Sequence, residues 1–435
     1  MHIVIIGNGI TGITCALEIR RQDPRVEISV ISAESEHFFS RTALMYIYMG
    51  HMKYEHIKPY ENWFWSKNRL TLVRAYVQKV NPQLKTLSLD NGRLIAYDKL
   101  IIASGSVPNK FGWPGQDLQG VQGLYSLQDL ITMELCTRNI QHAVIVGGGL
   151  IGIEMVEMLL SRSIGVTFLV REKAYWSNIL PLQEAELVSR HIRRHPIHLL
   201  TNTELKEILS DAEGRVKSVI THHGQEIPCQ FVGLTAGVSP NIHFLKDSNI
   251  QTDHGVLVNE YLETNIADVY AAGDCAQFRN PKPDHPAVEQ LWYTGKMQAE
   301  ALAKTICGNR KVYDRGIWFN SAKFLDIEYQ TYGLMQANPQ SHESSFYWEH
   351  PNGRMAFRVN FHKNGHALSG FNFLGIRFRQ AIAEDWIGGQ KTVEYALRNL
   401  QQGWFDPEFS KPYYRQIQQS FAEYTELNLA TKPML

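Results

Sequence analysis

Cysteine is scarce in this chain of 435 residues: there are five, at positions 15, 136, 229, 275 and 307. No two of them form a C-x-x-C pair, and none lies in a cluster with the spacing of metal ligands. A dithiol relay needs two neighbouring cysteines, and a structural zinc site needs about four ligands at close spacing. The sequence therefore predicts no metal site and five reduced thiols, which are typical of a protein of the cytoplasm.

An excess of one charge is also missing, because Lys plus Arg and Asp plus Glu are 43 each. This balance gives no argument for binding to nucleic acid or to an anionic membrane. The longest apolar stretch, residues 143–160, is interrupted by glycines and by Glu154 and Glu157, so we expect a strand and a helix there and no membrane span. No basic region precedes the first apolar run, so we expect no signal peptide.

Three glycines near the start carry the strongest signal in the chain. Residues 2–6 are rich in β-branched side chains and predict a buried strand, and residues 13–20 predict a helix. Between them Gly7, Gly9 and Gly12 match G-x-G-x-x-G. In this motif the first glycine allows a tight turn, the second lets a pyrophosphate approach the backbone, and the third lets the helix pack closely on the strand.

An acidic residue completes this motif. Residues 26–32 predict a second strand, and Glu34 follows about twenty residues after the glycines, where a carboxylate meets the ribose hydroxyls. The alternative is a glycine-rich turn without a ligand. Strand, glycine loop, helix and acid together favour a dinucleotide-binding unit.

The same unit occurs a second time. Gly147, Gly149 and Gly152 again stand between a predicted strand and a predicted helix, at residues 153–162, and another strand is predicted at 166–170. The segments 90–109 and 223–241 also resemble each other and end in Gly-Ser-Val-Pro-Asn and Gly-Val-Ser-Pro-Asn. Two such units imply two bound dinucleotides.

Two further segments point to a family. Residues 97–106 read YDKLIIASGS, and residues 268–276 read DVYAAGDCA. With the two glycine motifs, in this order, they resemble the two-dinucleotide-binding-domain flavoproteins, the pyridine nucleotide-disulfide oxidoreductase family. The resemblance is nearest to its ferredoxin and rubredoxin reductases and NADH oxidases without redox cysteines. It covers residues 1–310 clearly.

The resemblance implies an α/β fold with two doubly wound, Rossmann-like domains and a C-terminal α+β interface domain. It places an FAD-binding domain at residues 1–110 and 245–310, an NAD(P)-binding domain at 111–244, and the interface domain at 311–435. In the interface domain we expect strands at 327–335, 345–348, 355–362 and 367–373, with Asn-Gly hairpin turns between the last three. Helices are expected at 376–387 and 392–402, and little order in the last fifteen residues.

The resemblance also implies the site residues. The cofactor-binding residues that it indicates or supports are Gly7, Gly9, Gly12, Glu34, Arg41, Ala103, Gly105, Gly273, Asp274, Glu289, Trp292 and Trp318 for FAD, and Gly147, Gly149, Gly152, Arg171 and Gly237 for NAD(P)H. The catalytic candidates are Glu154, expected in the first turn of its helix near the nicotinamide, and Tyr46, where relatives often have a lysine beside the flavin. For several of these a structural role is the alternative: Glu154 as a helix-start acid, Arg41 as a solvated side chain, and Trp318 as core.

A redox thiol is missing from the position where the family's disulfide reductases carry one. That position corresponds to Thr42, and no cysteine lies between Cys15 and Cys136. Arg171 matches a position that contacts the 2′-phosphate of NADPH in some relatives, which favours NADPH; Glu172 next to it suits the ribose of NADH, which stays the alternative.

These features predict a cytoplasmic NAD(P)H-dependent FAD oxidoreductase that passes electrons to an acceptor, foremost a small iron–sulfur protein of the ferredoxin or rubredoxin type. An NAD(P)H oxidase or quinone reductase, or a flavin-bearing interaction protein resembling apoptosis-inducing factor, remain alternatives. The C-terminal domain could mediate oligomer formation. Five basic residues fall close together in this domain and are expected to form an ordinary solvated face, with a docking face for an acidic partner as the alternative: Arg354, Arg358, Lys363, Arg377 and Arg379.

Overall fold

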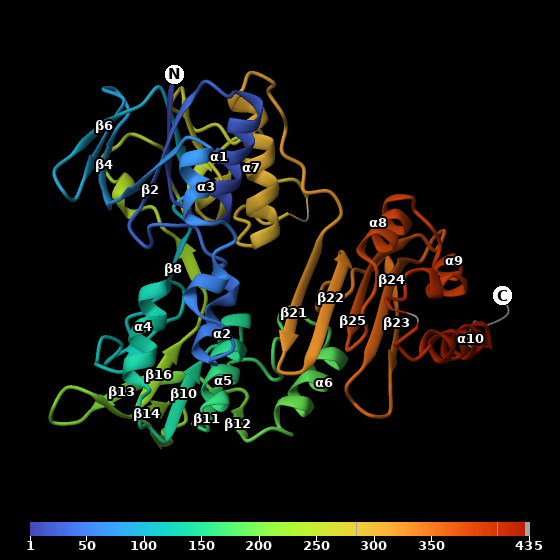
Figure 1. Cartoon of the computed structure of the whole chain (residues 1–435). Coiled ribbons are helices and arrows are strands. Elements are labelled where there is room, and N and C mark those ends of the chain that lie inside the picture. Colours follow the sequence, from blue (N-terminus) through green and yellow to red (C-terminus); the bar gives the residue numbers. More distant parts are fainter. Residues whose placement is uncertain (284, 407, 431–435) are drawn as a thin grey trace. The chain divides into compact units, whose positions relative to one another are not determined.

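The computed structural model describes residues 1–283, 285–406 and 408–430 (Figure 1). The chain divides into two compact units. Unit 1 comprises Met1–Ile140, Ser210–Val216 and Phe231–Arg315, and unit 2 comprises Gln141–Leu209, Lys217–Gln230 and Gly316–Leu435. Each is described by itself.

A parallel five-stranded sheet forms the centre of unit 1, in the order β19-β7-β1-β2-β3. Its strands are β1 (His2–Ile6), β2 (Glu27–Ser32), β3 (Leu70–Arg74), β7 (Lys99–Ile102) and β19 (Val269–Ala271). They read as short apolar runs because both faces of the sheet are buried. The strands expected at residues 2–6 and 26–32 are therefore confirmed, the second beginning one residue later.

Helices α1 (Ile10–Gln22) and α7 (Trp292–Ile306) pack against each other in unit 1 (Figure 1). Gly295 permits this close approach, because a Cβ there would come within 2.6 Å of Thr11 Oγ1. The other helices of this unit are α2 (Leu44–Tyr48), α3 (Asn62–Lys67) and α4 (Leu127–Cys136), with 3₁₀ turns η1 (Arg41–Ala43), η2 (Tyr54–Ile57), η3 (His243–Leu245) and η4 (Gly273–Cys275).

Short strands complete unit 1. A three-stranded sheet has β4 (Val77–Asn81), β5 (Thr86–Leu89) and β6 (Leu94–Ala96). Three pairs are β8 (Ser106–Pro108) with β17 (Val238–Pro240), β18 (Val256–Val258) with β20 (Ala276–Phe278), and β9 (Val121–Gln122) with β16 (Phe231–Leu234). The pair β8–β17 joins the segments 90–109 and 223–241, whose sequences resemble each other.

Unit 2 begins with parallel strands β10 (His142–Val146), β11 (Gly165–Leu169) and β12 (Ile197–Leu200). They are connected by helices α5 (Leu150–Ser161) and α6 (Leu182–Ile192), and followed by a small sheet of β13 (Leu205–Ser210), β14 (Val216–Thr221) and β15 (Glu226–Pro228). The second glycine motif thus lies between a strand and a helix, as the sequence predicts.

The C-terminal part of unit 2 is an antiparallel sheet with strand order β21-β22-β25-β24-β23. Its strands are β21 (Phe319–Phe324), β22 (Ile327–Gly333), β23 (Glu343–Glu349), β24 (Ala356–His362) and β25 (Leu368–Leu374). Gly353 and Gly365, at the two Asn-Gly turns, have φ of 64° and 76°, which glycine adopts without strain. The four expected strands and both hairpins are confirmed, and β21 is an additional strand.

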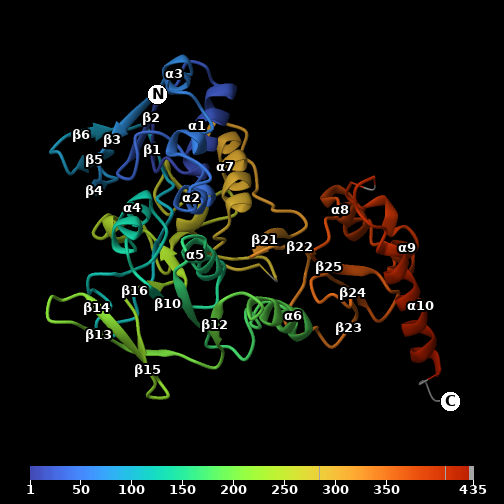
Figure 2. The ribbon, with the colours of Figure 1, turned by 60° about the horizontal axis from the view of Figure 1, so that its bottom comes forward.

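Helices α8 (Gln380–Gly388), α9 (Val393–Arg398) and α10 (Tyr414–Ala430) lie together on one face of this sheet in both views, with the 3₁₀ turn η5 (Leu400–Gln402) (Figure 2). An aromatic core fills the space between them and the sheet. The sequence predicts helices at 376–387 and 392–402 and little order in the last fifteen residues. Residues 421–430 instead form the end of α10, and 431–435 lie outside the described residues.

Arg358 is buried, so it belongs neither to a solvated basic face nor to a docking face. Side chains alternate along a strand, so Phe357 and Val359 of β24 face the helices while Arg358 faces the other side of the sheet. That side is covered by α6, where Arg358 forms a buried ion pair with Glu184. Arg354 and Arg377 are exposed but paired with Asp326 and Glu328, and Lys363 Nζ donates to the Ser341 carbonyl.

Candidate functional site

The first glycine loop has the backbone that its sequence predicts. Gly7 has a φ of 109°, and a Cβ on it would meet the Ala103 carbonyl oxygen at 2.1 Å. A Cβ on Gly12 would meet the Gly7 carbonyl oxygen at 2.0 Å. At Gly9 a Cβ would find no atom within 4 Å, so this backbone faces open space. Gly7 and Gly12 are therefore required by packing, and Gly9 leaves room for a ligand to approach.

Helix α1 starts directly at this loop. Gly9 is its N-cap, no side chain caps it, and its first turn holds no acidic residue. No acidic side chain in the first turn of α1 therefore balances the partial positive charge of the helix N-terminus. A phosphate group suits such a helix start.

Glu34 is held by an arginine that the sequence also singled out. Arg41 donates two hydrogen bonds to the Glu34 carboxylate, of 2.7 and 2.5 Å, and the Leu127 amide adds a third of 2.9 Å. Burial alone would lower the pKa of Arg41, but the hydrogen bonds and charge of Glu34 outweigh it, and the pKa is raised. Arg41 is therefore an ion-pair partner of the predicted ribose acid, and its alternative as a freely solvated side chain is wrong.

Asp274 lies in the same neighbourhood. Ser106 Oγ and Tyr125 OH donate to its Oδ2 at 3.1 and 3.3 Å, and the Arg41 guanidinium stacks over the Tyr125 ring at 4.4 Å. Burial raises the pKa of Asp274. Asp274 is distant in sequence from Glu34 and Arg41, and Tyr125 links it to them. We call Glu34, Arg41, Ser106, Tyr125 and Asp274 the unit 1 cluster.

Tyr125 is a site residue that sequence reasoning missed. Its hydroxyl also accepts a 2.9 Å hydrogen bond from the Ser106 amide, and a Cβ on Gly105, whose φ is 71°, would meet that hydroxyl at 2.9 Å. The only nearby sequence signal is the capping box from Ser126 to Asp129 at the start of α4. That signal marks a helix start and says nothing about the tyrosine before it.

Gly273 and Glu289 are both packed tightly within unit 1. Gly273 has a φ of 78°, and a Cβ there would come within 2.4 Å of Thr11 Oγ1. The Glu289 side chain is buried and receives hydrogen bonds from Arg315 at 3.1 Å and from Tyr313 at 2.7 Å. These protein contacts occupy both of its carboxylate oxygens, and contact of Glu289 with a cofactor stays a prediction.

The aromatic candidates lie on different elements. Trp292 begins α7 and is 38% exposed, and the Tyr46 ring on α2 stacks on His51. Trp318, in unit 2, is half-buried, and its carbonyl accepts a hydrogen bond from Gly333. Gly237 has a φ of 94° and accepts a hydrogen bond from the Asn109 amide. Their roles at a cofactor stay predictions.

The second glycine loop, in unit 2, repeats the features of the first. Gly147 has a φ of 116°, and Gly149 is the N-cap of α5 without a side-chain cap or an acid in the first turn. Because α5 begins at Leu150, Glu154 lies in the second turn, and its expected place in the first turn is wrong. Burial, followed by the charge of Glu157, raises the pKa of Glu154 to about 7. A carboxyl group with such a pKa can hold or release a proton near neutral pH.

Arg171 follows directly after β11. Its side chain is 70% exposed and forms an ion pair with Glu172, at 3.2 Å. An exposed guanidinium at the end of the second strand of such a unit is free to turn toward a 2′-phosphate.

All five cysteines are free thiols. Cys15, Cys229 and Cys275 are buried. Burial raises the pKa of each of these three, that of Cys229 to about 12. Burial also raises the pKa of the partly exposed Cys307. A thiol with a raised pKa is a poor nucleophile, so the described structure offers no thiolate for a redox relay at these four positions.

Known proteins resemble this chain over most of its length. A family model described as pyridine nucleotide-disulphide oxidoreductase matches residues 1–299. A nitrite reductase [NAD(P)H] of Bacillus subtilis is 28% identical over 330 residues, 75% of this chain, although the chain spans only 40% of that relative. A rubredoxin-NAD(+) reductase of Acinetobacter baylyi is 30% identical over 316 residues, 71% of this chain and 79% of its own length.

Two further similarities extend into the C-terminal part. A ferredoxin–NAD(P)(+) reductase of Sphingomonas sp is 26% identical over 413 residues, 94% of this chain and 96% of its own length. The crystal structure of a ferredoxin reductase from Rhodopseudomonas palustris matches with a TM-score of 0.78 at 20% identity, covering 86% of this chain and 91% of that one. This structural match confirms the predicted fold. Across the described residues, no helix is both long and apolar enough to cross a bilayer.

Proposed function

This chain belongs to the pyridine nucleotide-disulphide oxidoreductase family, and we propose that it transfers electrons from NAD(P)H through FAD to a small iron–sulfur protein. Membership makes it an FAD-dependent NAD(P)H oxidoreductase. The iron–sulfur acceptor is the specific part of the proposal. It is supported by the relatives named rubredoxin and ferredoxin reductases.

The absence of a cysteine at the position of the family's redox thiol is the observation that carries the proposal. Thr42, where the family's disulfide reductases would have a cysteine, is exposed and lies beside Ser40, with 3.2 Å between the two hydroxyl oxygens. Without a thiol relay there, electrons must leave the flavin directly. A flavin takes up a hydride and can release electrons one at a time, which suits an iron–sulfur acceptor.

The residues of unit 1 fit the FAD that this function requires. Gly9 leaves the backbone open where a pyrophosphate would approach, and the start of α1 favours its charge. Glu34, oriented by Arg41, would accept hydrogen bonds from the ribose of the adenosine. Asp274 would bind the ribityl chain, with Tyr125 and Ser106 fixing the carboxylate.

In unit 2 the second loop would hold NAD(P)H. The N-terminus of α5 would take the pyrophosphate, and Arg171 would contact the 2′-phosphate when NADPH is bound. Glu154 would lie near the nicotinamide, where its raised pKa lets it hold a proton below about pH 7.

The proposed domain boundaries follow the same reasoning. Strand β19, from the segment 245–310, pairs in parallel with β7 of the segment 1–110. This pairing supports an FAD-binding domain built from both segments, with 111–244 as the NAD(P)-binding domain and 311–435 as the interface domain. We also infer a cytoplasmic location, because reducing compartments preserve free thiols such as the five found here.

Anaerobic flavin reduction and acceptor competition test this proposal. The FAD-loaded protein is mixed with NADH or NADPH, and its reoxidation is then followed with a rubredoxin, a [2Fe–2S] ferredoxin, O₂ and a quinone. We expect an iron–sulfur protein to reoxidise the flavin faster than O₂ or the quinone. Faster reaction with O₂ or the quinone would make the protein an oxidase or a quinone reductase. Very slow flavin reduction with a long-lived charge-transfer complex would instead indicate a flavin-bearing interaction protein.

A further inference from the structure

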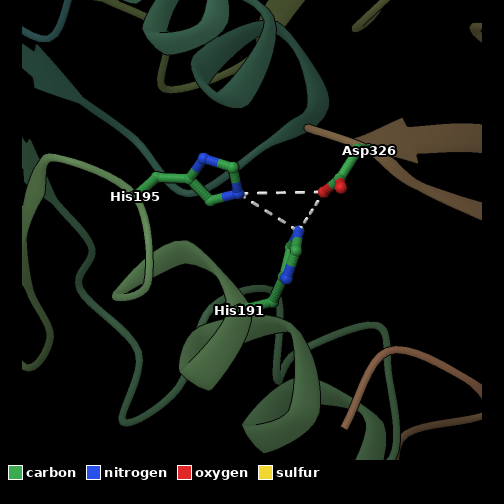
Figure 3. A group of neighbouring side chains, drawn as sticks. All are labelled: His191, His195 and Asp326. Carbon is green, nitrogen blue, oxygen red and sulfur yellow. Dashed lines mark hydrogen bonds and ion pairs between the residues drawn. The ribbon is translucent and has the colours of Figure 1, made fainter. Parts of the chain in front are cut away.

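Two histidines and one aspartate meet in unit 2, outside the proposed cofactor sites. His191 lies in the last turn of α6, and His195 follows it by four positions in the turns after the helix. Asp326 lies in the tight turn between β21 and β22. Figure 3 shows the three side chains pointing toward one another from these two elements. The sequence predicts no metal site from its cysteines, and local spacing does not reveal this group, because Asp326 is far along the chain from the two histidines.

The spacing of the ligand atoms suits a metal ion. The two Nε2 atoms are 3.4 Å apart, and His195 Nε2 is 3.7 Å from Asp326 Oδ1. His191 Nε2 lies closest to the same Oδ1, and all three ligand atoms are within 4.8 Å of one another. Zinc binds nitrogen and oxygen at about 2.0–2.1 Å in a tetrahedron, which places its ligands roughly 3.3 Å apart. Two of the three separations are therefore close to this value. The third, between His191 Nε2 and Asp326 Oδ1, must lengthen when an ion binds.

Ordinary hydrogen bonding explains only part of the cluster. His191 Nε2 hydrogen-bonds Asp326 Oδ1 and also lies in a long hydrogen bond of 3.4 Å with His195 Nε2, although one ring nitrogen cannot donate to the first and accept from the second at once. His195 Nε2 also faces the same aspartate oxygen at 3.7 Å, beyond hydrogen-bond range. Two imidazole nitrogens and a carboxylate oxygen that converge on one point form the donor set that a first-row divalent ion prefers. After α6 the chain stays tightly wound, because the Arg194 and His195 amides donate to the His191 and Ile192 carbonyls, and this turn brings the second ring to the same point.

The surroundings of the cluster fit an accessible ion site. The His191 side chain is buried at 4% exposure, whereas His195 and Asp326 are 32% and 48% exposed. An ion could therefore enter from solvent. Arg354 contacts Oδ2 of Asp326, which orients the carboxylate and leaves Oδ1 toward the histidines. His191 Nδ1 is buried and has no hydrogen-bond partner among the described residues, so the ring is held from its Nε2 side.

We propose that His191, His195 and Asp326 bind one divalent transition-metal ion, Zn²⁺ foremost, through Nε2, Nε2 and Oδ1. Water completes a four-coordinate ion, as in zinc sites with three protein ligands. The ion ties the end of α6 to the β21–β22 turn. Because it binds only the folded arrangement of these two elements, it stabilises the folded state by mass action.

Zinc titration of tag-free, chelator-stripped protein tests the site. We expect one equivalent of Zn²⁺ to bind and to raise the Tm, and Co²⁺ to give the visible absorption of a tetrahedral ion. His195→Ala and Asp326→Asn should each weaken Zn²⁺ binding at least tenfold and remove the cobalt spectrum. His342→Ala is the matched control, because this exposed histidine of unit 2 stacks on His362 away from the cluster and should leave binding unchanged.

Several results would overturn the site. They are no saturable binding to the wild-type protein, equal affinity in the His195→Ala and Asp326→Asn variants, or an equal loss in His342→Ala. His195 is partly exposed, so its replacement should leave the fold intact, and the far-UV circular dichroism spectrum of each variant verifies this. If one variant fails to fold, the Zn²⁺ affinity of the other still tests the site, because each variant removes a different ligand.

Discussion

Asp274 is the carboxylate of the unit 1 cluster that accepts hydrogen bonds from Ser106 and Tyr125. Replacing Asp274 by Ala removes the acceptor of Ser106 and Tyr125 and the group proposed to bind the ribityl chain. We expect the purified variant to retain less than half of the FAD of the wild-type protein, because hydrogen bonds to charged groups contribute about 1.5–3 kcal/mol. The flavin-to-protein absorbance ratio measures this. Asp117→Ala, at an exposed aspartate of the same unit, should keep its FAD; unchanged flavin in Asp274→Ala would argue against the assignment.

Glu154 gives the protein a pH dependence that can be calculated in sign. Its pKa is raised from 4.5 to about 7 in the folded state, chiefly by burial. Between these two values the folded state binds more protons than the unfolded state, so rising pH lowers the stability. We expect the Tm of the wild-type protein to fall relative to Glu154→Gln from about pH 4.5 to about pH 7 and to stay level above it. Thermal unfolding of both proteins across this range measures the difference.

The Glu157 charge provides a control for this effect. It is the second cause of the raised pKa of Glu154, so Glu157→Gln should lower that pKa and narrow the pH window. A difference between wild type and Glu154→Gln that does not change with pH would contradict the assignment of the ionisation to Glu154.

Arg171 tests the preference between the two nicotinamide cofactors. Because its side chain is exposed beside β11 and its ion pair with Glu172 is solvated, Arg171→Ala should cost the fold almost nothing. We expect kcat/KM for NADPH to fall about tenfold or more, because a charged hydrogen bond to phosphate contributes about 1.5–3 kcal/mol. The kcat/KM for NADH should change less than about twofold, because NADH has no 2′-phosphate. Steady-state kinetics with both cofactors decide this, and an equal loss with both would rule out contact with the 2′-phosphate.

At the scale of elements, the C-terminal sheet is held from both faces by different forces. Apolar side chains of β24 and β25 pack on the helices, whereas Arg358 turns toward α6. Its guanidinium forms two hydrogen bonds with Glu184, of 2.6 and 2.8 Å, and a third with Ser345 Oγ, of 2.7 Å. A buried charge without its partner is costly, so this pair fixes how α6 lies on the sheet.

Removing one partner of this pair should destabilise the protein strongly. Glu184→Gln leaves the Arg358 charge buried without a counter-charge, and we expect a loss of about 3–5 kcal/mol of stability. The double variant Glu184→Leu with Arg358→Met should recover part of this loss, because it buries no charge. Thermal and denaturant unfolding measure both, and the exposed pair Arg377 with Glu328 supplies the control: Arg377→Met should cost under about 1 kcal/mol. Equal losses of stability at the two ion pairs would show that burial does not determine how much each pair contributes to stability.

At the scale of the whole molecule, electron transfer should not depend on any thiol. We expect a variant with all five cysteines replaced by Ala to lose about 1 kcal/mol per buried site and to keep its flavin reduction by NAD(P)H. Anaerobic stopped-flow measurement of flavin bleaching tests this half-reaction. Loss of the half-reaction in a variant that folds and retains FAD would disprove a mechanism without thiols.

Local sequence spacing determined the two nucleotide-binding units of this protein. A glycine loop, the strand before it and the helix after it are set by residues within about twenty positions, and their backbone requirements are strict. Gly7 and Gly12 confirm this, because a Cβ on either would collide with the main chain. The Asn-Gly hairpins of the C-terminal sheet were predictable for the same reason, since φ above zero favours glycine at these turns.

Only the tertiary structure decided which distant side chains meet. Alternation along β24 predicts that Arg358 leaves the helical face, but not that α6 covers the other face and supplies Glu184. Tyr125, which the sequence marks only by the capping box that follows it, is placed against Asp274 by the return of the chain from a segment far along the sequence. His191 and Asp326 likewise meet through the packing of a helix end on a turn. Such contacts depend on how whole helices and sheets pack. That packing results from many weak interactions between residues distant in sequence, so it cannot be predicted from local residue spacing.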